Sequence, residues 1–462
     1  MNLLSEFEKF IRENCLVSRN EKLLLGVSGG VDSVVLLNLF LIIKNEWNLS
    51  ISVAHLNHML RGRYADRDEF FVRDIARQWG VAFYSRRADV REFSRTERCS
   101  IEEGARRVRF EFLNDILSRI GYDNIALGHQ ANDQAETVVM NLLRGSGIRG
   151  LRGIRPRSGR VIHPLLFATR EMIEEHAHRN NLPYVEDATN KKRHYMRNRI
   201  RLDIVKRMEK VMGSHIIKGI CRSSISALEV EELLEKETEV AWKSAVSVKS
   251  SDEIILDINR FLGYLKAVQK YILIRIIETI FFHRQIRSFE IDRIYDLICH
   301  GKSGSRVILE KGFMAVRSGD TVAFIKRREP FRPVNVRVNG SVTIKGLGLR
   351  ITTSLIEWQG NRIPQRGNPD VELFDYDKLS FPLVLRSYRM GDRFYPLGMR
   401  GKRKLKEFFI DSKIPVYYRS SIPLLTSGED IVWIVGHRID ERFRITEETR
   451  RALKIMVQKI DQ

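Results

Sequence analysis

Cysteine is scarce in this chain, and long hydrophobic segments are absent. The four cysteines among 462 residues, Cys15, Cys99, Cys221 and Cys299, are widely separated and include no Cys-x-x-Cys pair. This spacing argues against a disulfide framework, a cysteine zinc site and paired-thiol redox chemistry. The longest apolar candidate, Val34–Ile43, is far shorter than the roughly 18 residues of a membrane span, so we expect no such span.

A signal-peptide core is also missing from the start of the sequence. Charged and apolar side chains are mixed throughout residues 1–15. Secretory signals instead contain an uninterrupted apolar stretch. We therefore expect a cytoplasmic protein.

Acidic residues are few relative to basic ones. The chain has 58 Asp and Glu against 79 Lys and Arg, a formal net charge of +21. Excess positive charge raises the affinity for a phosphate backbone, because binding releases counterions. We expect a polyanionic partner; charge kept for solubility and an acidic membrane surface are the alternatives.

Strand-like and helix-like segments alternate between residues 22 and 180. This alternation predicts an α/β fold with a doubly wound, mainly parallel sheet and crossover helices. Strands are expected at Leu23–Val27, Ile51–His55, Val81–Ser85, Asn124–Gly128 and Val161–Leu166.

The clearest predicted helix begins after Ser100, which forms a capping-box pattern with Glu103. Arg106, Arg107 and Arg109 should point mostly away from the core, where they could reach phosphates or remain solvated. The apolar face should contain Ile101, Ala105, Val108, Phe112 and Ile116.

The rest of the chain predicts two further regions. Long helical patterns at residues 225–245 and 265–282 indicate a helical domain, and shorter alternating segments follow it. We expect an α/β domain at residues 1–210, a helical linker or substrate domain at 211–330 and an α+β domain at 331–462.

A glycine-rich turn follows the first predicted strand and opens an apolar helix. Its sequence is Ser28-Gly29-Gly30-Val31-Asp32-Ser33. A helix N-terminus carries partial positive charge and free N–H groups, and glycines let the backbone approach an anion closely. We expect this turn to bind a nucleotide pyrophosphate.

Three other interpretations of this turn are weaker. A Walker loop needs Lys followed by Ser or Thr, where Val31-Asp32 stands. The Gly26–Gly30 segment matches the Gly-x-Ser-x-Gly elbow of serine hydrolases, but only about 25 residues precede the serine, too few for three strands. A plain glycine turn remains the third alternative.

Carboxylates near the ends of the first and fourth strands are candidate ligands. Asp32 and Asp133 could hold Mg²⁺, which prefers a few carboxylate oxygens together with substrate phosphates. Asp133 and Glu136 could instead bind a substrate ammonium, or could cap a helix. His129 could be a general base or a loop donor. We expect His55 to contact nucleotide or substrate, since a zinc site there lacks further ligands.

Two basic segments point to a phosphate-bearing substrate. Residues 144–153 are rich in Gly and Arg, which suits a mobile loop over the substrate or a flexible linker. Between Arg386 and Arg419, ten basic residues accompany three acidic ones. Aromatic side chains interleave with them and could stack on bases or belong to the core: Tyr388, Phe394, Tyr395, Phe408 and Phe409.

Taken together, the motifs resemble those of the tRNA(Ile)-lysidine synthetase family, which belongs to the N-type ATP pyrophosphatases (PP-loop proteins). The resemblance covers nearly the whole chain. It rests on Ser28–Ser33, His55–Gly62, Ala105–Phe110, Leu127–His129, Asp133–Thr137, Arg144–Gly147, Asp187–Asn190, Arg197–Arg201, Gly391–Phe394 and Trp433–Gly436.

The resemblance implies ATP-dependent ligation of lysine to C2 of the wobble cytidine in tRNA(Ile) with a CAU anticodon, through an adenylated intermediate. It implies Mg²⁺ as a cofactor, and the chain could form a homodimer. The implied catalytic residues are Asp32, Asp133, Glu136 and His129. The turn from Ser28 to Ser33 would bind nucleotide together with His55 and Arg109. The tRNA or lysine would contact Arg106, Arg144, Arg197, Arg201, Arg393, Lys402, Arg403 and Lys404.

Two positions depart from the family pattern. His163 stands where Arg is usual, which puts a fixed cationic contact in doubt because His is mostly neutral near pH 7. Thr189 conservatively replaces Ser. The alternative functions are another PP-loop tRNA modifier, such as a thiolating enzyme, and a non-catalytic RNA-binding protein.

Overall fold

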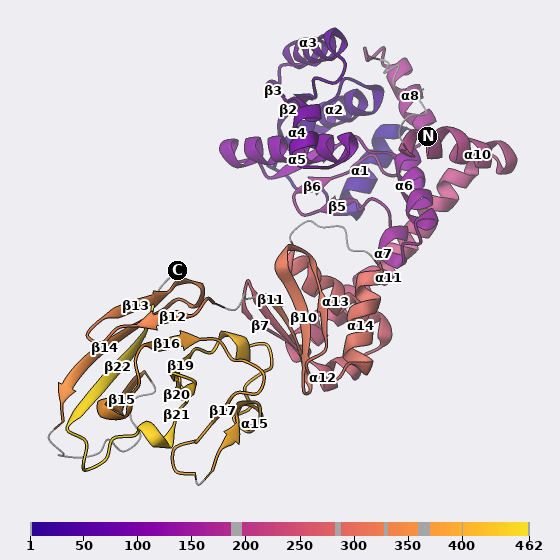
Figure 1. Cartoon of the computed structure of the whole chain (residues 1–462). Helices are drawn as coiled ribbons and strands as arrows, with labels where there is room; N and C mark the ends of the chain where they lie inside the picture. Colours follow the sequence, from indigo (N-terminus) through magenta and orange to yellow (C-terminus); the bar gives the residue numbers. More distant parts are fainter. Residues whose placement is uncertain are drawn as a thin grey trace. The chain divides into compact units, whose positions relative to one another are not determined.

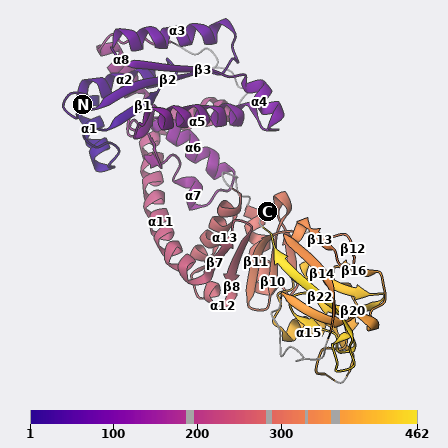
Figure 2. The same ribbon diagram turned by 90° about the vertical axis from the view of Figure 1, so that its left-hand side faces the viewer.

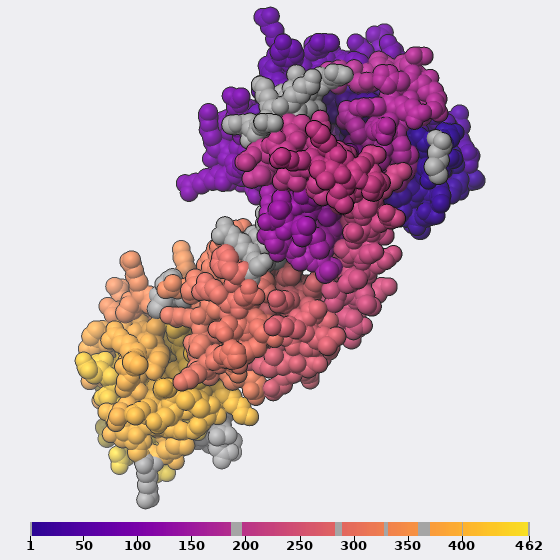
Figure 3. All heavy atoms as spheres, turned by 90° about the vertical axis from the view of Figure 1, so that its right-hand side faces the viewer, coloured from indigo at the N-terminus to yellow at the C-terminus, as the bar shows by residue number. Residues whose placement is uncertain are grey.

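The computed structural model describes residues 2–185, 196–281, 288–327, 331–358, 370–399 and 401–460. The chain forms two compact units, Met1–Leu233 and Leu234–Gln462, each with its own hydrophobic core (Figure 1). Figure 3 draws all heavy atoms of the two units as spheres. Within the described ranges, no helix is long and apolar enough to cross a membrane. The division into three domains at residues 210 and 330 stays a prediction.

The first unit is built on a six-stranded sheet with the order β3-β2-β1-β4-β6-β5. All neighbours pair in parallel except β5 and β6. The predicted doubly wound, mainly parallel sheet is thus confirmed. The fifth predicted strand is shorter than expected, because Pro164 has no N–H to continue the ladder. The strands are β1 (Lys22–Gly26), β2 (Ser50–Asn57), β3 (Ala82–Arg87), β4 (Asn124–Leu127), β5 (Arg157–Ser158) and β6 (Val161–Ile162).

Helices cover both faces of this sheet, with α2 and α3 on one side and α5 on the other (Figure 2). Phe7 of α1 packs edge-on against Phe40 of α2, with ring centroids 5.1 Å apart. The helices are α1 (Leu3–Glu13), α2 (Val31–Ile43), α3 (Arg63–Gln78), α4 (Val90–Thr96), α5 (Ile101–Ile120), α6 (Ala131–Leu143), α7 (Ile148–Leu151), α8 (Arg170–Arg179), α9 (Met196–Arg199), a π-helical turn (Ile200–Val205), α10 (Lys206–Met212) and α11 (His215–Ala245).

Helix α5 confirms the predicted N-cap, since Ser100 Oγ accepts a hydrogen bond from the backbone N–H of Glu103 at 3.1 Å. Val108 and Phe112 are buried as predicted, but Ile101 is exposed. Arg109, predicted to point away from the core, is half-buried because its position borders the stripe through Val108 and Phe112. Arg109 lies close enough to His129 to help lower the pKa of that histidine.

The second unit begins with helices packed on a five-stranded antiparallel sheet, in the order β7-β8-β11-β10-β9. The two predicted long helices are present as α11 and α13, but the sheet was not predicted because its strands are short and partly charged. The elements are β7 (Val246–Ser250), β8 (Glu253–Asp257), α12 (Ile258–Leu262), α13 (Lys266–Ile280), α14 (Ser288–His300), β9 (Arg306–Ile308), β10 (Phe313–Ser318) and β11 (Thr321–Lys326).

The C-terminal part is mainly antiparallel β structure around the buried side chains of Phe374 and Trp433. Its sheets have the orders β12-β16-β19-β20-β21, β13-β14-β22-β15 and β17-β18. The predicted α+β class is confirmed, with α15 as its one α-helix in the described ranges. The elements are β12 (Val334–Val336), β13 (Ser341–Ile344), β14 (Leu349–Glu357), β15 (Val371–Asp375), β16 (Leu383–Arg386), β17 (Arg393–Phe394), β18 (Arg403–Lys404), α15 (Leu405–Asp411), β19 (Leu424–Ser427), β20 (Asp430–Ile434), β21 (Arg438–Ile439) and β22 (Arg451–Lys459).

Candidate active site

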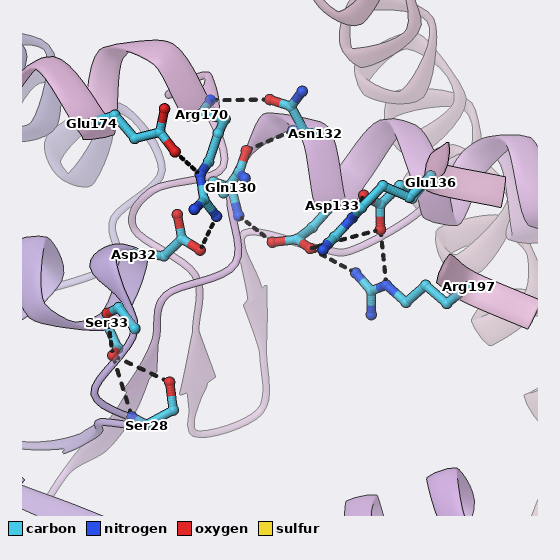
Figure 4. Close-up of polar contacts among 12 residues, drawn as sticks. Ser28, Asp32, Ser33, Gln130, Asn132, Asp133, Glu136, Arg170, Glu174 and Arg197 are labelled. Carbon is cyan, nitrogen blue, oxygen red and sulfur yellow. Dashed lines mark hydrogen bonds and ion pairs between the residues drawn. The ribbon is translucent and has the colours of Figure 1, made fainter. Parts of the chain in front are cut away.

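The turn between β1 and α2 has the geometry of an anion-binding turn. Gly29 has a φ of +93°, a left-handed value that favours glycine. Ser33 Oγ donates to the Gly30 carbonyl at 2.9 Å, accepts from the Ser28 N–H at 3.2 Å and lies 3.3 Å from Ser28 Oγ (Figure 4). Gly30 provides no side-chain cap to α2, so N–H groups of its first turn remain available to an anion.

A second turn, between β4 and α6, packs directly on the first one. A Cβ added to Gly128 would lie 3.1 Å from the Asp32 carbonyl oxygen and 3.2 Å from the Ser33 nitrogen. Only glycine permits this approach without displacing backbone. The contact brings Asp32 and the residues that follow Gly128 to one edge of the sheet, where ligands bind in folds of this kind.

Asp32 lies at this edge with one oxygen paired and one unpaired. Its Oδ2 is 3.3 Å from Arg170 Nη1, whereas its buried Oδ1 has no hydrogen-bond partner (Figure 4). Burial raises the pKa of Asp32 to about 6, although Arg170 opposes the shift. An orphaned carboxylate oxygen beside an anion-binding turn fits a divalent cation carried by a nucleotide.

Arg170 was not predicted from the sequence. Its Nε lies 2.6 Å from Glu174, and its backbone N–H donates to Asn132 Oδ1 at 3.0 Å. It therefore ties the N-terminus of α8 to both turns of the site. As a charged residue in the first turn of an ordinary surface helix, it carries no sequence signal of this role.

Asp133 and Glu136, which were predicted to meet a substrate cation, pair with two arginines of this chain (Figure 4). Arg197 Nη2 lies 2.9 Å from Asp133 Oδ1, and Arg197 Nε lies 3.1 Å from Glu136 Oε2. Arg201 Nε lies 2.5 Å from Glu136 Oε1. Asp133 Oδ2 also accepts from the Gln130 N–H at 3.1 Å, so the helix-capping role holds as well. Both arginines were predicted as substrate contacts rather than as partners of these carboxylates.

Three histidines line the same edge in neutral form, two of them buried and His129 half-buried. His55 Nδ1 lies 2.9 Å from the Val27 carbonyl, and burial lowers its pKa. The ring of His129 lies 4.8 Å from that of His163, edge to face, and its Nδ1 is buried without a hydrogen-bond partner. Burial, reinforced by His163 and nearby arginines, lowers the pKa of His129 to about 3. His163 Nδ1 lies 2.9 Å from the Arg155 carbonyl, so this position holds a neutral, anchored ring.

Arg107 and Arg109 of α5 lie in different environments. Arg107 pairs with Glu103 on the same helix at 2.9 Å and is exposed. Arg109 is half-buried, and burial together with Arg106 and Arg197 lowers its pKa. Like charges gathered in this way create a positive potential that favours an anionic ligand.

The basic segment at residues 144–153 is anchored at its C-terminal end by Gln134. The amide nitrogen of Gln134 donates to the carbonyls of Arg152 at 2.9 Å and Ile154 at 3.2 Å and to Ser224 Oγ at 2.9 Å. Its oxygen accepts from the Ile154 N–H at 2.6 Å. Gly153 allows this approach, because a Cβ there would lie 2.5 Å from that oxygen.

Glu231 of α11 provides a second anchor for the segment. This fully buried carboxylate pairs with Arg152, with Arg155 at 3.2 Å and with Arg149 at 3.8 Å. Arg144, at the start of the segment, is exposed. Neither Gln134 nor Glu231 was predicted, because only the fold brings α11 beside this segment.

The predicted RNA contacts near the C-terminus lie in the second unit. Arg393 of β17 stands opposite Lys404 of β18, Arg403 pairs with Asp411, and Lys402 lies 6.0 Å from the Tyr395 ring centroid. Among the aromatic candidates, Phe394 and Phe409 are fully buried core residues, whereas Tyr388, Tyr395 and Phe408 are half-buried. The motif at residues 187–190 lies outside the described residues.

The fold and the turn between β1 and α2 together define a PP-loop protein. The PP-loop domain family matches residues 2–208, and the TilS substrate C-terminal domain family matches residues 383–455. A tRNA(Ile)-lysidine synthase of Caldanaerobacter subterraneus subsp. tengcongensis is 31% identical over 98% of this chain and 97% of its own length, and one of Clostridioides difficile is 33% identical over 97% and 98%. The chain belongs to the tRNA(Ile)-lysidine synthase family.

The raised pKa of Asp32 predicts a stability that depends on pH. The folded protein binds this proton more tightly than the unfolded chain, so the contribution of Asp32 to stability is most favourable below about pH 4 and falls as pH rises through about 6. We expect Asp32→Asn to raise the free energy of unfolding by about 2 kcal/mol at pH 7.5 without ligands, and by much less at pH 4.

Urea unfolding at the two pH values measures this effect. The exposed Asp74→Asn substitution on α3 is the matched control and should change neither value. An Asp32→Asn protein that is less stable than the wild type at pH 7.5 would contradict the burial of this charge.

The Glu231 cluster predicts a large loss of stability when its carboxylate is neutralised. Glu231→Gln removes the buried negative charge that three half-buried guanidinium groups share, and we expect a cost of about 3 kcal/mol. Urea unfolding measures it, with the adjacent exposed Glu232→Gln as the control. Equal losses in the two variants would show that the anchor is unimportant.

Proposed function

We propose that this chain joins L-lysine to C2 of the wobble cytidine in tRNA(Ile) with a CAU anticodon, consuming ATP and releasing pyrophosphate and AMP. The observation that carries the proposal is the uncapped N-terminus of α2 behind the Ser28–Ser33 turn. This turn lies in a chain that aligns end to end with synthases of that name.

The first step forms the activated tRNA. The C2 oxygen of the cytidine attacks the α-phosphorus of ATP, a new C–O–P linkage forms, and pyrophosphate leaves. The Ser28–Ser33 turn would hold the departing pyrophosphate with backbone N–H groups and the positive end of α2. Asp32, through its orphaned Oδ1, is the residue best placed to hold Mg²⁺, which neutralises leaving-group charge when bound. Asp133 is a weaker candidate, since both its oxygens already have partners.

The second step uses the carboxylates that now pair with arginine. Asp133 and Glu136 already hold two cationic side chains, and the lysine substrate carries the same charge. We infer that these carboxylates orient the ammonium group and that one of them accepts its proton, after which the free amine attacks C2. The bond between C2 and the AMP oxygen breaks, and AMP leaves.

The histidines and the remaining arginines have supporting roles in this proposal. A pKa of about 3 makes His129 a weak proton acceptor, so it acts as a neutral hydrogen-bonding group toward the reacting cytosine ring.

The nucleotide and the tRNA are bound by other residues in this proposal. His55 and Arg109 face the nucleotide. Arg106 and Arg144 of the first unit, and Arg393, Lys402, Arg403 and Lys404 of the second unit, bind tRNA phosphates. The homodimer and the cytoplasmic location remain predictions.

Incubation with ATP, labelled lysine and bulk tRNA tests the function. We expect label to enter one minor isoleucine tRNA and pyrophosphate release to require that tRNA. Pyrophosphate release without lysine incorporation would indicate a different PP-loop modifier. Absence of both would indicate a non-catalytic RNA-binding protein.

The carboxylate roles predict a selective defect in the second step. Asp133→Asn should raise the lysine concentration needed for half-maximal rate by about tenfold, the equivalent of one lost charge-assisted hydrogen bond. Release of pyrophosphate that depends on tRNA should persist. Steady-state assays over a lysine series measure this, with exposed Glu171→Gln of α8 as the control. An unchanged lysine requirement would remove Asp133 from the lysine site.

A further inference from the structure

A buried ion pair closes a short turn before β17. Each of the two Nη atoms of Arg386 lies 2.8 Å from an oxygen of Asp392, and both side chains are only 11% exposed. Asp392 Oδ2 also accepts from the Arg389 N–H at 2.8 Å, and Gly391 adopts a φ of +94°. A buried pair adds little net stability, but any conformation that separates its charges is strongly unfavourable. The pair therefore fixes the shape of this turn.

The fixed turn displays an apolar side chain at its tip. Met390 is 96% exposed, the most exposed of the large apolar residues in the described ranges. Isolated exposed apolar residues are common on protein surfaces. This one differs because the turn that carries it is restrained by the Arg386–Asp392 pair and because an arginine precedes it directly in the sequence.

Cations gather on the element that the turn is joined to. Arg393 and Lys404 stand directly opposite each other in the β17–β18 ribbon and are both exposed. Like charges in this register repel each other, so the pairing weakens the ribbon unless an anion lies between them. The Asp392 carbonyl accepts from the Leu405 N–H at 2.8 Å, which ties the turn to the start of α15 beside this ribbon (Figure 1).

We propose that Met390 is an apolar RNA contact, which packs on an exposed base or ribose of the tRNA while Arg393 and Lys404 bind the adjoining phosphates. Arg386 and Asp392 are positioning residues that hold Met390 in place. The proposal rests on the proposed function, which supplies RNA as the occupant. RNA-binding surfaces combine basic side chains that contact phosphates with side chains that pack on exposed bases, and Met390 would take the second role beside Arg393 and Lys404.

Equilibrium binding of tRNA(Ile) to the full chain at several salt concentrations tests the proposal. Met390→Ala should weaken binding about tenfold at every salt concentration, because it removes a packing contact and no charge. Arg393→Gln should instead lower the slope of log affinity against log salt by roughly one, because it removes a phosphate contact. Leu265→Ala is the matched control, since Leu265 is 80% exposed outside the C-terminal domain and should bind as wild type.

A double-mutant cycle tests the positioning role of Asp392. If Asp392 acts by holding Met390, the loss caused by Met390→Ala should shrink in an Asp392→Asn background. A merely structural role would leave the two losses additive and would exclude Asp392 as a positioning residue. If the wild type binds tRNA and Met390→Ala binds it with the same affinity, the inference is wrong and the proposed function stands. A wild-type chain that binds no tRNA overturns the inference and the proposed function together.

Discussion

Direct packing of one backbone turn on another determines the geometry of the candidate site. Gly128 brings the β4–α6 turn against the β1–α2 turn, at a distance that no other residue permits without displacing backbone. Asp32 lies in the first turn of α2 and Asp133 in the first turn of α6, directly after these two backbone turns. Asp133 lies close enough to help raise the pKa of Asp32. Arg170 then bridges the turns through Asp32 and Asn132. The anion-binding turn and the acidic cluster are therefore one structural unit.

Charge within this unit is balanced by the chain itself. Glu136 is almost fully buried, and its two arginine partners supply the counter-charges that a buried carboxylate requires. If lysine binds to these carboxylates, as proposed above, it replaces part of that pairing, and its affinity then depends on the difference between two ion pairs rather than on one. Such an exchange favours discrimination over tight binding.

Local sequence patterns predicted much of the fold, and less of the site. The Ser28–Ser33 turn and the cap at Ser100 depend on neighbouring residues, so their sequence signals are strong. The ion pairs of Asp133 and Glu136 join residues about 60 positions apart, and Glu231 meets a loop about 80 positions earlier. No periodicity encodes such contacts. The middle sheet was missed for a different reason, because its strands are short and partly charged and so give only a weak alternating pattern.

Competition between ATP and pyrophosphate for the free enzyme is the most direct measurement of the central claim, that the β1–α2 turn binds a pyrophosphate group. We predict that pyrophosphate displaces ATP completely, and that Gly29→Ala abolishes binding of both, because alanine disfavours the φ of +93° and its Cβ would lie 3.3 Å from the side chains of Phe71 and Val72. Gly304→Ala in the second unit has nearly the same φ, +95°, but the nearest atom to its Cβ would lie 4.0 Å away, so this control should bind both ligands as wild type. ATP binding that resists pyrophosphate, or that survives Gly29→Ala, would contradict the account.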